Sequence, residues 1–293
     1  MRHLLPPRFG ASSAHYLRRP SPPIMPELPE VETVRRGVAP HVVGRRIEKT
    51  IVRERRLRLP IKNCFCKNVD GRRVINLRRR GKYLIFDLED GALIAHLGMS
   101  GVFYFSSSPP DKTMHEHVGL KIGGRFLIYK DPRRFGCIVF CEGEPGSHSL
   151  LKHLGPEPLS AAFDGAALRD NLRGRGTPLK TALMDGKVVA GIGNIYAAES
   201  LHLAGIRPQT PARKLSAVRA EKLAAAIKNV LRRAIQAGGS TLRDFAKADG
   251  APGYFQTRWK VYGREGARCD CGGEIKKIAQ NARATYYCPR CQR

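Results

Sequence analysis

Hydrophobic and polar residues change their spacing twice along this chain. From residue 29 to about 39, Val31, Val34 and Val38 recur every three or four positions, which predicts a helix. Pro29 suits the first turn of that helix, because the first amide groups of a helix have no partner inside it. Gly44 stands beyond its expected end.

The next region has the composition of strands. Segments rich in β-branched and aromatic residues follow one another, separated by turns such as Asp90-Gly91 and Gly123-Gly124. Short strands at this spacing predict a β-sandwich or a barrel. The segments are 73–77, 83–88, 93–97, 102–105, 118–122, 125–129 and 137–140.

Helical spacing returns beyond a Pro- and Gly-rich linker at 155–158. One helix is predicted at 197–204 and a longer one at 216–237, where Gly238-Gly239 ends it and Ser240 can cap another. The apolar residues of the longer helix lie four apart, at Leu223, Ile227, Leu231 and Ile235. The tail then returns to short strands.

The net charge narrows the choice of partner. The 293 residues include 52 Lys and Arg against 25 Asp and Glu, a net charge of +27. A surface this basic usually binds a polyanionic partner, so we favour nucleic-acid binding as the explanation of the charge. A basic protein whose charge only maintains solubility is the second explanation, and binding to an anionic membrane surface is the third. Hydrophobic residues make up 42%, enough for a packed core. No apolar run approaches the roughly 18 residues of a membrane helix, so we expect no membrane span.

Four of the eight cysteines form two pairs near the end of the chain. One residue separates Cys269 from Cys271, two separate Cys288 from Cys291, and sixteen lie between the pairs. Two such turns aim four thiolates at one point, as a structural Zn²⁺ site requires, although the first pair is one residue shorter than the standard spacing. Four exposed free thiols would be a liability. We therefore expect one structural Zn²⁺ and, since no secretory signal is visible, a reducing compartment.

Residues 1–24 differ from the rest of the chain. They hold four arginines, five prolines and no acidic residue. The prolines prevent the sustained amphipathic helix of a transit peptide, so organellar import ranks below a cytoplasmic location. We interpret residues 1–25 as an extension that is either disordered or, for residues 1–24, not translated because the true start is Met25.

Six motifs along the chain resemble the formamidopyrimidine-DNA glycosylases, the bifunctional base-excision enzymes for oxidised purines. They are MPELPEVE at 25–32, RRGKYL at 79–84, HLGMSG at 96–101, DPRRFG at 131–136, LGPEPL at 154–159 and GIGNIY at 191–196. The resemblance covers residues 25–293 and implies an α+β fold. Its parts would be a catalytic β-sandwich domain at 26–155, a helix-two-turn-helix DNA-binding domain at 156–258 and a zinc finger at 259–293. The implied partner is double-stranded DNA containing 8-oxoguanine or formamidopyrimidines, bound by a monomer.

The resemblance also implies a catalytic set. Pro26 matches the proline whose exposed nitrogen attacks the sugar C1′, and Glu27 matches the acid that handles protons at the sugar ring. Lys82 matches a lysine that contacts phosphates and supports β-elimination, and Arg283 matches an arginine that supports δ-elimination. Taken alone, Pro26 would be explained as a helix-entry proline and Lys82 as a solvated lysine at a strand edge.

Six further residues match DNA-contact positions of the family. Met99, Arg133 and Phe135 would fill the space left by a flipped nucleotide, with Arg133 reading the base opposite. Arg175 is matched by spacing alone. The remaining matches are Asn194, at a helix N-terminus suited to phosphate, and His115.

Two other functions stay open at this point. An enzyme of the related endonuclease VIII type would prefer oxidised pyrimidines, but its signature begins Pro-Glu-Gly-Pro, whereas residues 26–29 read Pro-Glu-Leu-Pro. A catalytically inactive DNA-binding zinc protein is possible only if Pro26 is never exposed as an N-terminus.

Overall fold

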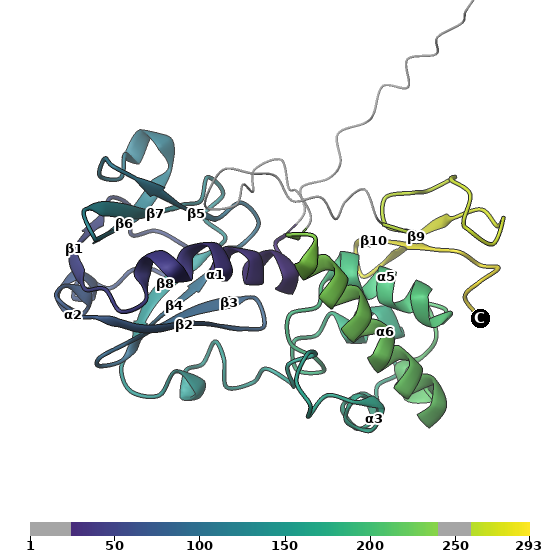
Figure 1. Ribbon diagram of the computed structural model, residues 1–293. Helices are drawn as coiled ribbons and strands as arrows, with labels where there is room; N and C mark the ends of the chain where they lie inside the picture. The colour runs from purple at the N-terminus through teal and green to yellow at the C-terminus, as the bar shows by residue number, and fades with distance from the viewer. Residues whose placement is uncertain (1–24, 240–258) are drawn as a thin grey trace, which may run out of the picture.

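The computed structural model describes residues 25–239 and 259–293, which form two domains and a C-terminal module (Figure 1). Residues 1–24 of the predicted extension, the predicted cap at Ser240 and the predicted boundary at 258 lie outside the described residues. Among the helices that are described, none is long and apolar enough to cross a bilayer.

Helix α1 (Leu28–Val42) opens the N-terminal domain and confirms the first predicted helix. Its buried apolar residues include Val31, Val34 and Val38, the stripe expected from the sequence. The helix continues past the predicted end despite Pro40, and it ends where Val43 turns extended and donates its N–H to the Ala39 carbonyl at 3.0 Å.

Eight strands form two four-stranded antiparallel sheets, with the orders β1-β6-β7-β5 and β2-β3-β4-β8. The predicted strands are confirmed, with ends that differ by a few residues. The bounds are β1 (Ile47–Val52), β2 (Val74–Arg80), β3 (Tyr83–Leu88), β4 (Ala92–His96), β5 (Val102–Ser106), β6 (Glu116–Ile122), β7 (Arg125–Lys130) and β8 (Cys137–Cys141). The sequence did not predict β1, because a register shift between Ile47 and Lys49 breaks its alternation. It also missed the short helix α2 (Phe65–Val69).

Helix α1 belongs to the core between these sheets. It contacts β2 and β3 of one sheet and β5 of the other, and Figure 1 shows it running across the domain alongside both layers. Apolar side chains of α1 and of both sheets join one buried cluster. The α+β class and the N-terminal sandwich with its helix are therefore confirmed.

The second domain is helical. It contains α3 (Gly165–Leu172), α4 (Leu179–Leu183), α5 (Asn194–Ala204) and α6 (Ala217–Gln236). Helix α6 has the predicted extent, with the Ser216 hydroxyl accepting from the Arg219 N–H as its cap. Helix α5 begins three residues before its predicted start of 197. Helices α3 and α4 were not predicted.

A two-stranded hairpin forms the C-terminal module. Strands β9 (Lys276–Gln280) and β10 (Arg283–Tyr287) pair antiparallel across the turn Asn281-Ala282. Both turn residues have positive φ, the conformation that matches the twist of a two-residue hairpin. Strand β10 contacts α5. Three 3-10 turns complete the described elements, at Lys112–Met114, Pro145–Ser147 and Ala212–Lys214.

Candidate active site and nucleic-acid interface

The N-terminus of helix α5 holds the side chain of Glu27. The Glu27 carboxylate accepts backbone N–H bonds from Gly193 at 2.6 Å, Ile195 at 2.9 Å and Tyr196 at 3.3 Å. These amides have no partner inside the helix, and the positive end of the helix dipole favours an anion there. Position 193 must be glycine, because a Cβ would lie 2.4 Å from the Glu27 Cδ. Glu27 is thus both buried and fully hydrogen-bonded.

A second buried carboxylate fixes the backbone beside Pro26. Glu30 Oε2 accepts the Glu27 N–H at 2.9 Å, and Glu30 Oε1 accepts the Tyr196 hydroxyl at 2.6 Å. The Leu28 N–H donates to the Gly191 carbonyl at 3.0 Å. The start of α1 is therefore tied to the start of α5, and Pro26 is buried where they meet.

Lys82 brings a positive charge to the same place. It lies in the turn between β2 and β3, directly after Gly81, which has a φ of +58°. Burial lowers the pKa of Lys82, the carboxylate of Glu27 opposes that change, and the charge of Arg283 adds to it. Burial likewise raises the pKa of Glu27, and the Lys82 charge partly reverses it. The site therefore holds a carboxyl that can retain a proton beside a lysine that can lose one.

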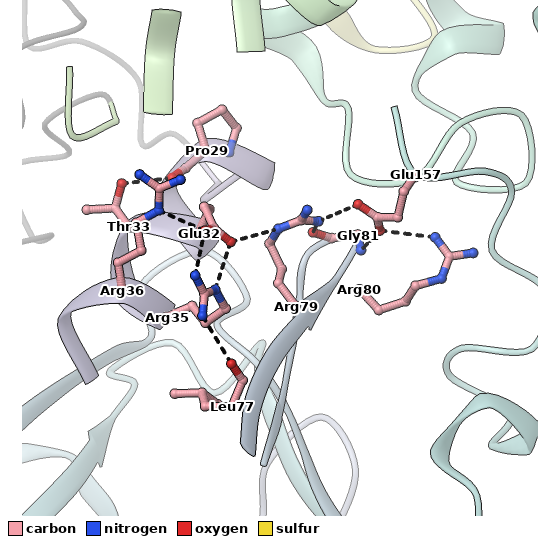
Figure 2. A network of polar contacts seen from close by, with 10 residues as sticks. All are labelled: Pro29, Glu32, Thr33, Arg35, Arg36, Leu77, Arg79, Arg80, Gly81 and Glu157. Atoms are coloured by element: carbon pink, nitrogen blue, oxygen red, sulfur yellow. Dashed lines mark hydrogen bonds and ion pairs between the residues drawn. The ribbon is translucent and has the colours of Figure 1, made fainter. Parts of the chain in front are cut away.

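An ion-pair network positions the turn that carries Lys82. Figure 2 shows Glu157, from the linker between the domains, facing this turn. Its carboxylate lies 2.8 Å from Arg79 Nη1 and 3.1 Å from Arg80 Nη1, and it accepts the Gly81 N–H at 2.5 Å. Arg79 also lies 3.4 Å from Glu32 on α1. The network joins α1, the β2–β3 hairpin and the linker into one support.

Lys180 is a buried lysine that the sequence did not single out. Its Nζ donates to the Asn194 Oδ1 and, at 3.4 Å, to the carbonyl of Ala284 on β10. Burial lowers its pKa to about 8, and the charge of Arg283 acts in the same direction. The only sequence signal was its place in an apolar stretch, LKTAL at 179–183, where a lysine is ordinarily on the solvent side.

Asn194 bonds the strand that carries Arg283. The Asn194 Nδ2 donates to the Ala284 carbonyl at 3.0 Å and to the Tyr262 hydroxyl at 3.3 Å. Arg283, next to Ala284, is exposed. The zinc hairpin is therefore fixed to the N-terminus of α5, with one arginine left facing solvent beside the site.

Two loops bring Met99, Arg133 and Phe135 together. Gly98 and Gly136 pack against each other so closely that a Cβ on Gly98 would lie 2.4 Å from the Gly136 nitrogen. The Arg133 guanidinium lies 4.8 Å from the centroid of the Phe135 ring, and Phe135 is 47% exposed although it is large and apolar. Met99 is half-buried.

Asp131 ties these two loops to each other. Its buried carboxylate accepts the Ser100 hydroxyl at 2.6 Å and the Gly136 N–H at 2.8 Å. The Ser100 hydroxyl oxygen in turn accepts the Arg133 N–H at 3.2 Å. The sequence contained both residues within recognised motifs, but their connecting role emerges only in three dimensions.

The other two predicted DNA contacts differ in their surroundings. The His115 side chain is exposed, and its backbone adopts the left-handed conformation with a φ of 59°. Its carbonyl accepts the Asp131 N–H at 3.1 Å, so His115 lies beside the loop that carries Arg133. Arg175 is half-exposed and pairs with Asp185 at 2.8 Å, and its Nε donates to the Asn171 carbonyl. Its guanidinium already has protein partners.

The four C-terminal cysteines converge as predicted. Their sulfur atoms all lie within 4.8 Å of one another, with Cys269 and Cys291 3.7 Å apart and Cys271 and Cys288 3.5 Å apart. Four thiolates at 2.3 Å from one zinc ion would be about 3.8 Å apart in a tetrahedron, so this set fits the metal. Zn²⁺ is the structural cofactor of the module.

Three family descriptions match successive parts of the chain. Residues 25–138 match the formamidopyrimidine-DNA glycosylase N-terminal domain, residues 154–246 match the formamidopyrimidine-DNA glycosylase H2TH domain, and residues 270–293 match the zinc finger found in FPG and IleRS.

Whole proteins are similar as well. The chain is 52% identical over 273 residues to a formamidopyrimidine-DNA glycosylase of Methylococcus capsulatus, covering 92% of this chain and 100% of that protein. The crystal structure of the MutM (Fpg) protein from Thermus thermophilus has 42% identity and a TM-score of 0.82, covering 91% of this chain and 98% of its own. A Lactococcus lactis Fpg mutant in complex with DNA containing Fapy-dG has 36% identity and a TM-score of 0.84, covering 92% and 100%.

Proposed function

This chain belongs to the formamidopyrimidine-DNA glycosylases, and we propose that it removes oxidised purines through a centre formed by Pro26, Glu27 and Lys82. It is a DNA glycosylase and a zinc-containing DNA-repair enzyme that acts on damaged double-stranded DNA. The observation that carries the proposed centre is the buried Glu27 carboxylate, held by three amides of α5 next to Pro26 and opposite Lys82.

Pro26 is proposed as the nucleophile. An α-amine has a reference pKa of about 7.7–8.0 against about 10.4 for lysine, so far more of it is neutral at pH 7. Its nitrogen would attack the sugar C1′ while the bond from C1′ to the base breaks and the base leaves with the bonding electron pair. The attacking nitrogen would lose its proton, and the C1′–O4′ bond of the sugar ring would then break, with O4′ taking a proton from Glu27. Because the nitrogen belongs to a secondary amine, its lone pair would form an iminium with C1′, which is cationic without any added proton on nitrogen.

Glu27 and Lys82 would handle the protons of the reaction. A carboxyl whose pKa is raised by burial is proposed to exchange a proton at the sugar ring. Lys82, a half-buried lysine whose pKa is lowered by desolvation, is proposed to accept one. Lys82 would take a proton from C2′, and the electron pair of that C–H bond would move into the iminium to give an enamine. The enamine would expel the 3′ phosphate, and a second elimination would expel the 5′ phosphate. Arg283, exposed beside the site, is proposed to hold phosphate during that second step.

The remaining residues are proposed to hold the DNA. Met99, Arg133 and Phe135 would enter the space that the flipped nucleotide leaves, with Arg133 reading the base opposite. His115, Asn194 and Arg175 would contact the phosphate backbone, and Arg175 would first have to leave Asp185. The proposed domain ranges are 26–155, 156–258 and 259–293. We also propose that the protein acts as a monomer in the cytoplasm.

In the 293-residue chain the Pro26 nitrogen is an amide bonded to Met25. Its lone pair is delocalised into the carbonyl, so it cannot form an iminium. The active form would therefore begin at Pro26, after translation from Met25 and removal of that methionine, or after cleavage of the preceding residues. The family match that begins at residue 25 supports this start.

The test is borohydride trapping on a duplex containing 8-oxoguanine. Protein that begins at Pro26 should form a covalent complex with the DNA, and protein that retains residues 1–25 should form none. Robust trapping by the full chain would show that another amine, such as that of Lys82, is the nucleophile. Preferential excision of oxidised pyrimidines would instead favour an enzyme of the endonuclease VIII type.

A further inference from the structure

The short first turn of the zinc module is held from outside, by helix α5. The imidazole Nε2 of His202, near the C-terminal end of α5, lies 3.3 Å from the Cys269 sulfur. A cysteine that ligates zinc is a thiolate without a proton, so the imidazole N–H must be the donor. We infer that His202 is a positioning residue of the zinc site, donating a hydrogen bond that orients Cys269 and stabilises its thiolate.

The short turn itself supplies a donor to its second cysteine, Cys271. After Cys271 the chain reverses through Gly272, at a φ of +80°, and Gly273. The Gly273 N–H lies 3.4 Å from the Cys271 sulfur, so Cys271 receives its donor from within the turn. Gly273 is packed against the sulfurs, since a Cβ there would lie 3.1 Å from that of Cys288.

Asp270, the residue between Cys269 and Cys271, is linked to α5 through Lys260. Asp270 pairs with Lys260 at 2.8 Å. Glu199, three residues before His202 on α5, accepts the N–H groups of Lys260 at 2.9 Å and Val261 at 3.0 Å. The segment that leads into the short turn is thus bound to α5 through Lys260 and Val261, and Asp270 joins it through its pair with Lys260.

The second cysteine pair is anchored to the same end of α5. The Gln292 side chain accepts the Cys288 N–H at 2.8 Å and donates to the Ile206 carbonyl at 2.8 Å. The Arg293 N–H donates to the carbonyl of Gly205, the residue that ends α5, at 3.1 Å. Both turns of the module therefore depend on one helix end, and His202 is the contact that reaches a sulfur directly.

Partners that hydrogen-bond to metal ligands commonly affect metal affinity about 10- to 100-fold. His202 should therefore slow the loss of zinc from the folded enzyme. This inference concerns the metal module alone and does not depend on the catalytic roles proposed above.

The test follows zinc rather than DNA cleavage. Zinc-loaded full-length proteins are mixed with excess EDTA, and the metal that remains bound is measured over time. His202→Leu should lose zinc about tenfold faster than the wild type. His202→Gln should release zinc at nearly the wild-type rate, because its side-chain amide can donate from a similar position. In the Co²⁺-substituted proteins, the thiolate-to-metal charge-transfer band should shift in His202→Leu and not in His202→Gln.

Leu203→Ala is the matched control, because Leu203 is the next residue on α5 and is exposed. It should release zinc at the wild-type rate. His202→Phe keeps a ring without a donor, and it repeats the test should the leucine variant fail to fold. Wild-type release by the leucine or phenylalanine variant would overturn the inference, and so would a glutamine variant that releases zinc as fast as they do.

Discussion

Glu27 is buried, yet its proposed role requires it to carry a negative charge and to exchange a proton. Burial alone would disfavour that charge. A carboxylate removed from water is costly unless its oxygens are hydrogen-bonded, and here three amides of α5 supply those bonds. Burial nevertheless raises its pKa, and the nearby Lys82 limits the rise. The balance suits a group that must exchange a proton during base loss and then remain in place.

Replacing Glu27 with glutamine should separate the two reactions of the enzyme. We expect Glu27→Gln, in protein that begins at Pro26, to lose excision of 8-oxoguanine by more than about 100-fold, the scale of a lost proton-transfer group. Cleavage at a preformed abasic site should fall much less, because no base has to leave. Single-turnover rates on both DNA substrates provide the measurement. Glu48→Gln, an exposed carboxylate on β1, serves as the control and should match the wild type. Equal losses on both substrates would contradict a role in base release.

Lys180 should make stability depend on pH. Its folded pKa of about 8 lies below the ordinary value of 10.5, so between these values the unfolded chain binds more protons than the folded one. The unfolding free energy should therefore rise with pH across this window, by up to about 3 kcal/mol from this group. Lys180→Met should lack that rise, as measured by urea unfolding at pH 7.5 and 10. A difference between variant and wild type that stays constant with pH would contradict the assignment.

Helix α5 connects the two ends of the second domain. Its eleven residues span about 16 Å, with the amides that hold Glu27 at one end and the zinc module at the other. Strand β10 returns along it to Asn194, so the position of Arg283 depends on the same helix. A change in the metal module can thus reach the site through one rigid element.

The loops that carry Met99, Arg133 and Phe135 act through a shared hydrogen bond, which Ser100→Ala should remove. Because Arg133 is proposed to read the base opposite the lesion, we expect excision opposite cytosine to exceed excision opposite adenine. Ser100 joins Asp131 to the Arg133 backbone, so its loss should reduce that preference about fivefold, equivalent to roughly 1 kcal/mol. Excision rates opposite the two bases provide the measurement. Ser107→Ala, exposed just beyond β5, is the control. An unchanged preference in active Ser100→Ala protein would show that the loops are positioned independently.

Three separate parts of the chain meet at the site. The start of α1 supplies Pro26 and Glu27, the β2–β3 hairpin supplies Lys82, and the zinc hairpin supplies Arg283. Two sets of contacts join the domains around this meeting point. Helix α1 contacts α6, and the linker residue Glu157 pairs with Arg79 and Arg80. The net charge of +27 gives the assembled surface a long-range attraction for DNA.

Binding to undamaged duplex should therefore weaken steeply with salt. The logarithm of the affinity should fall linearly with the logarithm of salt concentration, because each phosphate contact releases a counterion. Arg283→Gln should reduce the slope by about 1. Lys49→Gln, on β1 at the other end of the molecule from β10 in Figure 1, should leave it unchanged. Fluorescence anisotropy between 50 and 300 mM KCl provides the measurement, and a flat dependence would contradict phosphate-dominated binding.

The sequence by itself determined the features that depend on residues close to one another along the chain. The helical stripe of α1, the strands from β2 to β8, the glycine stop of α6 and the two cysteine pairs are all local patterns, and the structure confirms them. Ordered motifs also identified the family.

Only the tertiary structure decided which distant residues meet. Strand β1 and the early start of α5 were missed, because one depends on pairing with β6 and the other on a carboxylate 168 residues away from Ile195. Asp131 and His202 gave no sequence signal of their roles, and Lys180 had only its place in an apolar stretch. A lysine, an aspartate or a histidine is solvated by default, and the partners of these three lie on other elements. Their burial and hydrogen bonds are properties of packed domains, which periodicity along one segment does not encode.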